Sequence, residues 1–394
     1  TIEPDDPWSY IGYWGDHQLI YLLKFLEFSE KHFEGELSKL FTQEIFVYAN
    51  VPYKIKSFSE IYDNPKDTII FDEDSDKSIR ELREKMGSDG ALLYNNAGDI
   101  HRVNFLEKIL ATLLSKTSNL IPEGGIWMNT QRPEWNDANN ALVGNGISMV
   151  TLYYMKRFNS FLTRLLEKSN FEGINVSSEL SDFFDSITKG LDSFRPLIDV
   201  GFSDSDRKKF ISNLGTAGDN YRSSIYNEGF RGPKSEITKN KLISFCENLT
   251  DYLDHSIRRN ERSDGMYHSY NLLEKNEDGV GIGRLSVMLE GQVAVLSSGF
   301  LSPKQSLKLL DSLRESALYR KDQNTYILYP NKILPQFLDR NIIPPSSVKK
   351  SILFSEMLEN GNTQIIEKDK KGDFHFNGNF NNVNSLYASF EKLD

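Results

Sequence analysis

The segment Thr130-Gln131-Arg132-Pro133-Glu134-Trp135-Asn136-Asp137-Ala138-Asn139-Asn140 stands just before the most regular helical pattern of the chain. That pattern runs from Val150 to Leu166, with apolar residues recurring on one helical face. The segment itself carries two carboxylates, an indole, a guanidinium and several amides. Such a set suits a sugar, because the ring stacks on Trp while its hydroxyls pair with amides and carboxylates. A carboxylic acid in the same place can protonate a glycosidic oxygen.

Outward from this segment, the recurring unit is a helix, a polar loop and another helix. Apolar periodicity predicts helices at about 16–26, 77–86, 106–114, 150–166, 177–194, 203–228, 235–256, 289–296 and from 303. Residues 44–54 read as a strand or an extended connection, and no alternating strand pattern runs through the chain. We therefore predict a mainly all-α fold, an (α/α)6 toroid with short irregular or β-hairpin insertions. Every second loop of such a ring would contribute to one cavity.

Composition restricts the class of protein. At 39% hydrophobic and 26% charged, the 394 residues are typical of a globular protein, and we predict a single domain over 1–394. A polar segment, 361–394, is expected to be partly disordered. The net charge of −10 excludes nucleic acid and anionic membranes as favoured partners, and no run is long enough to cross a membrane. The single cysteine, Cys246, excludes an internal disulfide and fits a cytoplasmic location. Because the chain starts without Met, we expect flanking domains of a longer protein.

A second polar-aromatic group stands at the start of the first predicted helix. Trp14 precedes Asp16 and Gln18, and Asp16 occupies the position of a helix N-cap. Capping alone explains Asp16 as well as a functional role does. The neighbouring aromatic and amide groups nevertheless make this helix start a candidate for binding sugar hydroxyls.

The motif Glu134-Trp135-Asn136-Asp137 resembles the Asp-Trp-Asn-Asp segment of inverting glycoside phosphorylases that act on cellobiose, chitobiose or cellodextrin. Those enzymes belong to the six-hairpin, (α/α)6-barrel glycosidase superfamily. The resemblance implies that Asp137 is the general acid and that Trp135 contacts the sugar. Glu134 departs from the family pattern, which has Asp there. The group around Asp16 is similar, more weakly, to a sugar-binding helix start of the same superfamily.

The remaining polar residues of the motif, Arg132, Asn136 and Asn139, are predicted to bind substrate together with Glu134. The chain lacks recognisable phosphate-binding His and Arg stretches of those phosphorylases, and it lacks their N-terminal β-sandwich. Hydrolysis and phosphorolysis therefore both stay open, with inorganic phosphate as a co-substrate in the second case. No metal-ligand spacing is present, and we expect no cofactor.

Hydrolysis with inversion requires a second carboxylate to activate water. Glu290, in an apolar stretch after glycine-rich turns, is the candidate base. A helix-dipole role at a helix start is the competing explanation. Asp264 is the alternative base, although turn formation with Gly265 explains it equally well. His268 is a candidate contact for sugar or phosphate, while a lone loop His is more often structural.

Three functions fit these observations. The first is an inverting carbohydrate-active enzyme, a hydrolase or phosphorylase acting on a glucose-like oligosaccharide or polysaccharide. The second is a polysaccharide lyase, since α/α toroids also host elimination at uronic acids, although an acidic chain with an Asp-centred motif disfavours it. The third is a non-catalytic sugar-binding module in which Asp137 only caps a helix.

Overall fold

The computed structural model describes residues 16–129, 142, 144–335 and 340–392, with residues 16–18 described by their backbone alone. Contacts divide the chain into two compact units: unit 1, Thr1–Pro330, and unit 2, Asn331–Asp394. The polar segment from residue 361 is therefore part of a larger unit that starts at Asn331.

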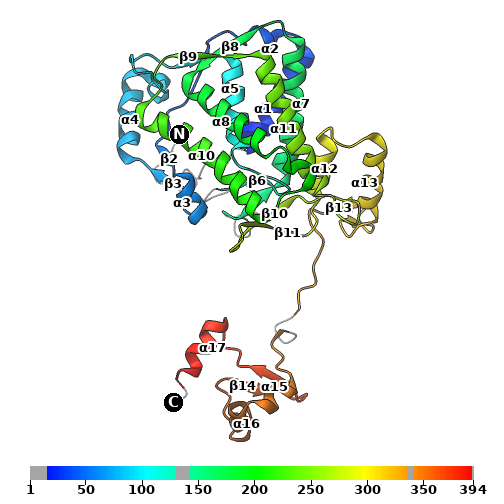
Figure 1. The fold of residues 1–394 in the computed structure, drawn as a ribbon. Helices are drawn as coiled ribbons and strands as arrows, with labels where there is room; N and C mark the ends of the chain where they lie inside the picture. Colours follow the sequence, from blue (N-terminus) through cyan, green and yellow to red (C-terminus); the bar gives the residue numbers. More distant parts are fainter. Residues whose placement is uncertain (1–15, 130–141, 143, 336–339, 393–394) are drawn as a thin grey trace. The chain divides into compact units, whose positions relative to one another are not determined.

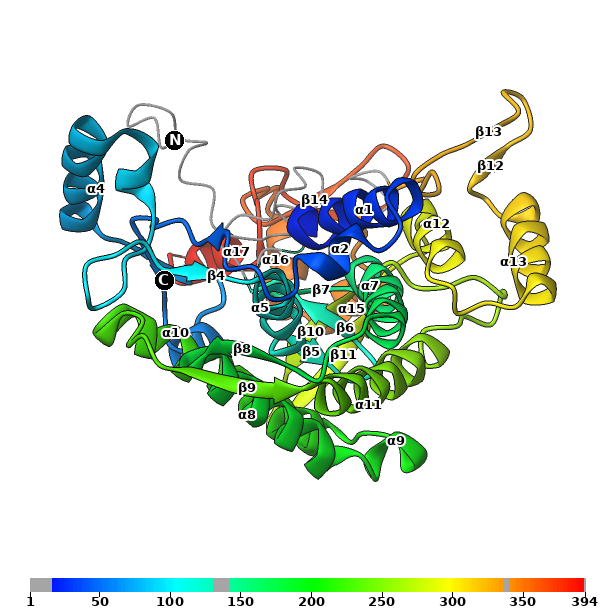
Figure 2. The ribbon, with the colours of Figure 1, turned by 90° about the horizontal axis from the view of Figure 1, so that it is seen from above.

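Long helices of unit 1 form where apolar periodicity predicts them. In Figure 2, α7 lies between α1 and α11, and it packs against α1, α11 and α12. The long helices are α1 (Asp16–His32), α4 (Glu73–Met86), α5 (Phe105–Thr117), α7 (Met149–Lys168), α8 (Ser178–Phe194), α10 (Asp204–Glu228), α11 (Lys239–Arg258), α12 (Leu289–Ser297) and α13 (Pro303–Glu315). None of the described helices is long and apolar enough to cross a lipid bilayer.

Helix ends also follow local chemistry. Ser302 caps α13, accepting a hydrogen bond from the backbone N–H of Gln305, while the Gln305 side chain accepts from the backbone N–H of Ser302. Ser203 caps α10 in the same way through Asp206. Gly87 ends α4 with φ of 70°, a backbone conformation that glycine adopts without strain.

Unit 1 is not the all-α toroid that the helical periodicity predicted. The described residues of unit 1 include a five-stranded antiparallel sheet in the order β11-β10-β7-β6-β5. In Figure 1 the strands of this sheet lie at one end of the helices α7, α10 and α11. The strands are β5 (Leu120–Ile121), β6 (Gly125–Trp127), β7 (Gly146–Ser148), β10 (Tyr270–Lys275) and β11 (Val280–Arg284). The (α/α)6 prediction is therefore wrong, and the fold is mixed α/β.

Glycine residues weaken the strand signal of β6 and β7 in the sequence. A Cβ at Gly125 would lie 2.7 Å from the carbonyl oxygen of Ser148, and a Cβ at Gly146 would lie 2.8 Å from that of Leu142. Close backbone approach thus requires glycine in two of the strands, although glycine is a poor strand former. The alternating pattern that identifies a strand is lost at the same positions.

Short elements complete unit 1. Two-stranded sheets pair β1 with β4, β2 with β3, β8 with β9 and β12 with β13. These elements are α2 (Glu36–Lys39), β1 (Phe46–Val47), β2 (Tyr53–Ile55), α3 (Phe58–Asp63), β3 (Ile69–Phe71), the 3-10 helix η2 (Gly87–Ala91), β4 (Arg102–Val103), β8 (Gly173–Ser177), α9 (Leu197–Val200), β9 (Lys234–Thr238), β12 (Tyr319–Arg320) and β13 (Thr325–Tyr326).

A buried polar network closes the turn between β5 and β6 at Glu123, whose φ is 64°. Oε2 accepts a hydrogen bond from Nη2 of Arg207 at 2.8 Å, and Oε1 accepts from Nε2 of His255 at 3.1 Å and from the backbone N–H of Phe202 at 3.3 Å. The backbone carbonyl accepts from Nδ2 of Asn260 at 2.8 Å. Burial by itself raises the pKa of Glu123, but the bonds from His255 and Arg207 outweigh it and lower the pKa to about 2.

Unit 2 has a small hydrophobic core of its own, centred on the buried residues Ile343, Val348, Met357, Ile365 and Ile366. Its elements are α15 (Pro345–Lys350), α16 (Ile352–Glu359), β14 (Ile366–Lys368), β15 (Phe374–Phe376) and α17 (Val383–Phe390). β14 and β15 form an antiparallel hairpin within the polar segment. The described residues of 361–394 thus include regular structure, and the apolar side chains of the hairpin pack against the core of unit 2.

Candidate functional site

The segment that carries Asp137 connects β6 to β7. Residues 130–141 and 143 lie outside the described residues, and so do residues 1–15. The predicted site residues Arg132, Glu134, Trp135, Asn136, Asp137 and Asn139, together with Trp14 and the side chains of Asp16 and Gln18, are therefore not placed. The structure does place both ends of the β6–β7 connection, at Asn129 and at Gly144.

Both ends of the connection are hydrogen-bonded to the sheet or to its extension, and the end at Asn129 is also bonded to the residue that follows α5. The backbone N–H of Met128 donates to the carbonyl oxygen of Gly146 at 2.8 Å, which extends the pairing of β6 with β7. Nδ2 of Asn129 donates to Oδ1 of Asn119 at 2.8 Å. Because Asn119 follows α5 directly, this bond ties one end of the connection to the C-terminal end of that helix.

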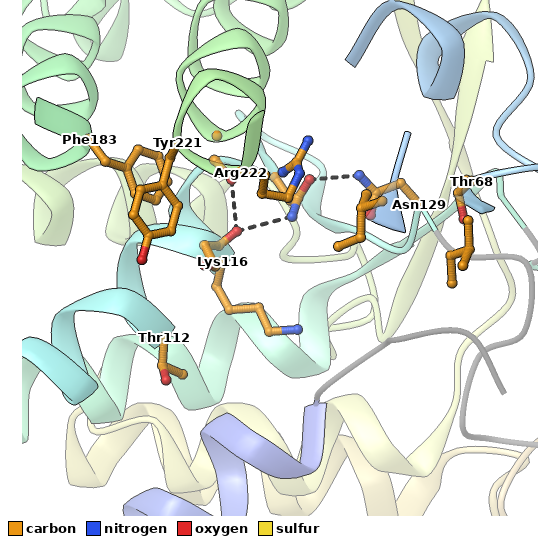
Figure 3. Close-up of a pocket in the computed structure, with 13 residues that line it drawn as sticks. Thr68, Thr112, Lys116, Asn129, Phe183, Tyr221 and Arg222 are labelled. Atoms are coloured by element: carbon orange, nitrogen blue, oxygen red, sulfur yellow. Dashed lines mark hydrogen bonds between the residues drawn. The ribbon is translucent and has the colours of Figure 1, made fainter. Parts of the chain in front are cut away.

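A cavity of about 100 Å³ with a mixed polar and apolar lining opens beside Asn129, large enough for several water molecules. We call it the α5–α10 pocket, because each of those two helices supplies three of its thirteen lining residues, and the paired strands β2 and β3 also contribute to the lining. Figure 3 shows the rings of Phe183 and Tyr221 at one end, Asn129 and Thr68 at the other, and Lys116 and Arg222 between them. The lining residues are Ile55, Thr68, Ile69, Thr112, Ser115, Lys116, Ser118, Asn119, Asn129, Phe183, Gly218, Tyr221 and Arg222.

The charge of the pocket favours an anion. Lys116 is 6% exposed, and none of the described residues that line the pocket is acidic. Nη2 of Arg222 lies 3.8 Å from Oδ1 of Asp219, while Oδ2 of Asp219 accepts from the backbone N–H of Phe58 at 2.9 Å. The buried Nε of Arg222 has no hydrogen-bond acceptor among the described residues. Burial lowers the pKa of Arg222, which shows how poorly its charge is solvated.

Two rigid features shape the rest of the pocket. The rings of Phe183 and Tyr221 are stacked with centroids 4.8 Å apart and planes at 12°, forming an apolar wall. On the polar side, Nδ2 of Asn119 donates to the carbonyl oxygen of Ser115 at 3.0 Å, and Oγ of Ser118 donates to the same carbonyl at 2.9 Å. An amide group has two N–H donors, so an Asn side chain held this way can still pair with a phosphate or sugar oxygen.

The predicted residues His268 and Glu290 lie at the other end of the sheet from Asn129 and Gly144. β7 pairs with β10 so that Gly146 faces Leu272 and Ser148 faces Tyr270, which places His268 beyond the far end of β7. Glu290 lies in the first turn of α12, where the backbone N–H of Gly291 donates to Oγ of Ser269 at 2.8 Å. The structure thus brings His268 and Glu290 toward each other and away from the described ends of the β6–β7 connection.

His268 is neutral at physiological pH. Burial lowers its pKa to about 4, and the nearby charges of Arg284 and Arg262 act in the same direction. Its ring therefore supplies hydrogen bonds but no positive charge for an anionic ligand. The alternative base, Asp264, accepts hydrogen bonds from Arg262 and from the backbone N–H of Met266, as a turn-forming carboxylate does.

Lys116, Asn119 and Arg222 were not among the site residues predicted from the sequence. The position of Lys116 on α5 could have indicated its burial in the sequence. It lies on the same buried helix face as Ile109 and Leu113, where a charged residue needs a partner or a ligand. Arg222 had no comparable signal, because it lies among polar residues in the second half of α10. The neighbours of Arg222 in the pocket are known only from the folded structure, in which α10 lies next to α5 and the paired strands β2 and β3.

Comparison with known proteins adds one finding. Residues 334–394 match the family model described as the GH149 phosphorylase insertion domain 2. The matched stretch coincides with unit 2 and does not extend into unit 1. No curated protein matches the chain. The similarity therefore concerns unit 2 alone.

Proposed function

We propose that this protein is a glycoside phosphorylase that reversibly cleaves a glycosidic bond of a glucose-like oligosaccharide with inversion at the anomeric carbon. The observation that carries the proposal is the similarity of residues 334–394 to a phosphorylase insertion domain. The motif around Asp137 and the α5–α10 pocket beside Asn129 support the same reaction.

In this proposal Asp137 is the general acid. It gives its proton to the glycosidic oxygen while the bond between that oxygen and the anomeric carbon breaks. A phosphate oxygen attacks the anomeric carbon from the opposite face, so the products are a sugar 1-phosphate of inverted configuration and a shortened saccharide. Phosphate is itself the nucleophile, and no protein base is needed. Glu290 therefore has no base role in this reaction.

The other residues of the motif are proposed to hold the sugar. Trp135 stacks on the ring, and Arg132, Glu134, Asn136 and Asn139 pair with hydroxyl groups. This division suits the side chains, because carbohydrate rings present apolar faces and polar edges.

The α5–α10 pocket is proposed to receive the phosphate. A phosphate group calls for cations and N–H donors in a site with limited water, and Lys116, Arg222 and the amides of Asn119 and Asn129 provide them. Asn129 immediately precedes the motif segment, which brings the pocket to one end of the connection that carries Asp137. The long 3.8 Å contact between Arg222 and Asp219 leaves Arg222 capacity for a further anionic partner.

Turnover with and without phosphate tests the proposal. Gluco-oligosaccharides of several linkages are incubated with the protein, and the products are identified by chromatography and by NMR of the anomeric proton. We expect sugar 1-phosphate of inverted configuration in the presence of phosphate and no cleavage in its absence. Asp137→Asn should lower kcat by about 10²- to 10⁴-fold while leaving oligosaccharide binding intact. Asp185→Asn, at an exposed position on α8, is the matched control.

Two results would overturn the proposal. Release of free reducing sugar without phosphate would make the protein a hydrolase. Equal turnover by the wild type and by Asp137→Asn would remove the acid role of Asp137.

A further inference from the structure

Two buried glycines, Gly215 and Gly218, stand in the middle of α10, although only proline is less favourable than glycine inside a helix. They are three residues apart and therefore lie on the same face of the helix. A Cβ at Gly215 would overlap the ring of Phe58 on α3. Close packing of the two helices thus explains Gly215, but it does not account for Gly218.

Gly218 lines the α5–α10 pocket. A Cβ at this position would lie 2.8 Å from Oγ and 3.1 Å from Cβ of Ser118, and 3.4 Å from Nη1 of Arg222. The Ser118 hydroxyl is held in place, because its Oγ donates to the carbonyl oxygen of Ser115 at 2.9 Å. A methyl group at position 218 would therefore occupy the space between Ser118, which follows α5, and the guanidinium group of Arg222.

This space is a substantial part of a small pocket. The volume of about 100 Å³ corresponds to about three water molecules at about 30 Å³ each. A tetrahedral oxyanion carries four oxygens, so it needs most of a cavity of this size. A methyl group in contact with Nη1 of Arg222 would lie where an anion oxygen approaches the guanidinium group.

We infer that Gly218 is a specificity-determining residue of the α5–α10 pocket: the absence of a side chain keeps open the space beside Arg222 that one oxygen of a tetrahedral oxyanion occupies. The inference rests on the proposed function, which places phosphate in this pocket. It goes further by assigning the fit of the anion to a residue that has no polar side chain. Gly218 cannot bind the anion through a side chain, so it acts through the shape of the site.

The substitution Gly218→Ala tests the inference by binding alone. Calorimetric titration with inorganic phosphate should give a dissociation constant about 10- to 100-fold higher than that of the wild type, the effect of losing one hydrogen bond from a charged donor. Gly190→Ala is the matched control and should bind phosphate as the wild type does. Gly190 is a buried glycine within α8, where a Cβ would lie 2.5 Å from Oδ1 of Asn213, and it is not among the described residues that line the pocket. Urea denaturation checks that both variants are folded.

A second substitution separates the shape of the pocket from the packing of the helix. Ser118→Gly removes both Ser118 atoms that a Cβ at position 218 would crowd, and it leaves the Arg222 side chain unchanged. We expect Gly218→Ala combined with Ser118→Gly to bind phosphate about 10- to 100-fold more weakly than Ser118→Gly alone, because the methyl group still lies beside Arg222. Recovery of the affinity in the double variant would make Gly218 a packing residue and overturn the inference. An unchanged dissociation constant in Gly218→Ala would overturn it as well.

Turnover distinguishes the failure of this inference from the failure of the proposed function. In Gly218→Ala the KM for phosphate should rise, while kcat at saturating phosphate and the KM for the oligosaccharide stay near their wild-type values, because only phosphate binding is altered. A fall in kcat with an unchanged KM for phosphate would contradict the inference. A wild type that binds phosphate but cleaves no oligosaccharide removes the proposed function, and the titrations still decide the role of Gly218. A wild type that performs phosphorolysis while Gly218→Ala keeps its phosphate affinity retains the proposed function and removes the inference.

Discussion

Glu123 and Arg207 form an ion pair in the interior of unit 1, with Oε2 and Nη2 2.8 Å apart and about a tenth of each side chain exposed. The pair joins the β5–β6 turn to α10, and His255 brings α11 to the same carboxylate. A positive φ at a residue other than glycine costs about 1–3 kcal/mol, and it persists only where the surroundings fix it. The carboxylate therefore explains why Glu rather than Gly occupies this turn.

Removing the charge of Glu123 should destabilise unit 1. Glu123→Gln keeps the shape of the side chain but leaves the buried Arg207 with Asp204 as its remaining acidic partner. We expect the free energy of unfolding to fall by about 3 kcal/mol, the range for breaking one side of a buried ion pair. Urea denaturation measures the change. Glu36→Gln, which removes an exposed pair with Lys39, should change it by less than about 0.5 kcal/mol.

The same pair predicts a pH dependence of stability. The pKa of Glu123 is about 2 in the folded protein, against an ordinary value of 4.5, so the folded state favours the ionised form. The contribution of the Glu123 carboxylate to the free energy of unfolding is therefore complete above pH 4.5, and it is lost as the pH falls toward 2. The difference in unfolding free energy between the wild type and Glu123→Gln should shrink over this window. A difference that stays constant from about pH 6 to about pH 3 would contradict the assignment.

The helices of unit 1 were predictable and the central sheet was not, for one physical reason. Helices such as α7 and α10 are long, and their apolar faces repeat over several turns. The strands β5, β6 and β7 are two or three residues long and are buried at every position, so they show no alternation. Their pairing depends on residues far apart in the sequence, such as Ser148 with Tyr270.

Gly125 offers a test of how tightly that sheet is built. Its φ is 127°, and a Cβ there would lie 2.7 Å from the carbonyl oxygen of Ser148. We expect Gly125→Ala to destabilise unit 1 by at least about 2 kcal/mol, combining backbone strain with a clash that the neighbouring strand cannot relieve. Thermal unfolding measures the change. Gly299→Ala separates the two effects, because Gly299 has φ of 77° and open space around its Cβ position.

Unit 2 should unfold independently of unit 1. Its core is small, and a unit of this size is marginally stable by itself. Ile366 is fully buried, so Ile366→Ala should cost about 2–5 kcal/mol and unfold unit 2 while leaving the unit 1 transition in place. Calorimetry distinguishes the two transitions. Ile352→Ala, at a position 77% exposed on α16, is the control, and a joint shift of both transitions would contradict independence.

The candidate site was predictable only in part. The chemistry of the Asp137 segment is local, and eleven neighbouring residues were enough to suggest a sugar and an acid. The α5–α10 pocket is assembled from α5, α8, α10 and the paired strands β2 and β3, and no local sequence pattern indicates that these elements meet. The same long-range pairing separates His268 and Glu290 from the described ends of the β6–β7 connection, although both read as plausible partners of Asp137 in sequence.

Arg222 should decide whether the α5–α10 pocket binds phosphate. A hydrogen bond from a charged donor contributes about 1.5–3 kcal/mol, so Arg222→Gln should weaken phosphate binding by about 10- to 100-fold. Calorimetric titration of the protein with inorganic phosphate measures the dissociation constant directly and needs no oligosaccharide substrate. Arg222→Lys keeps the charge and should retain part of the affinity, which separates loss of charge from loss of fold. Arg80→Gln, which removes an exposed pair with Asp76 on α4, should bind phosphate as the wild type does. An unchanged dissociation constant in a folded Arg222→Gln would show that phosphate, if it binds, does so outside this pocket.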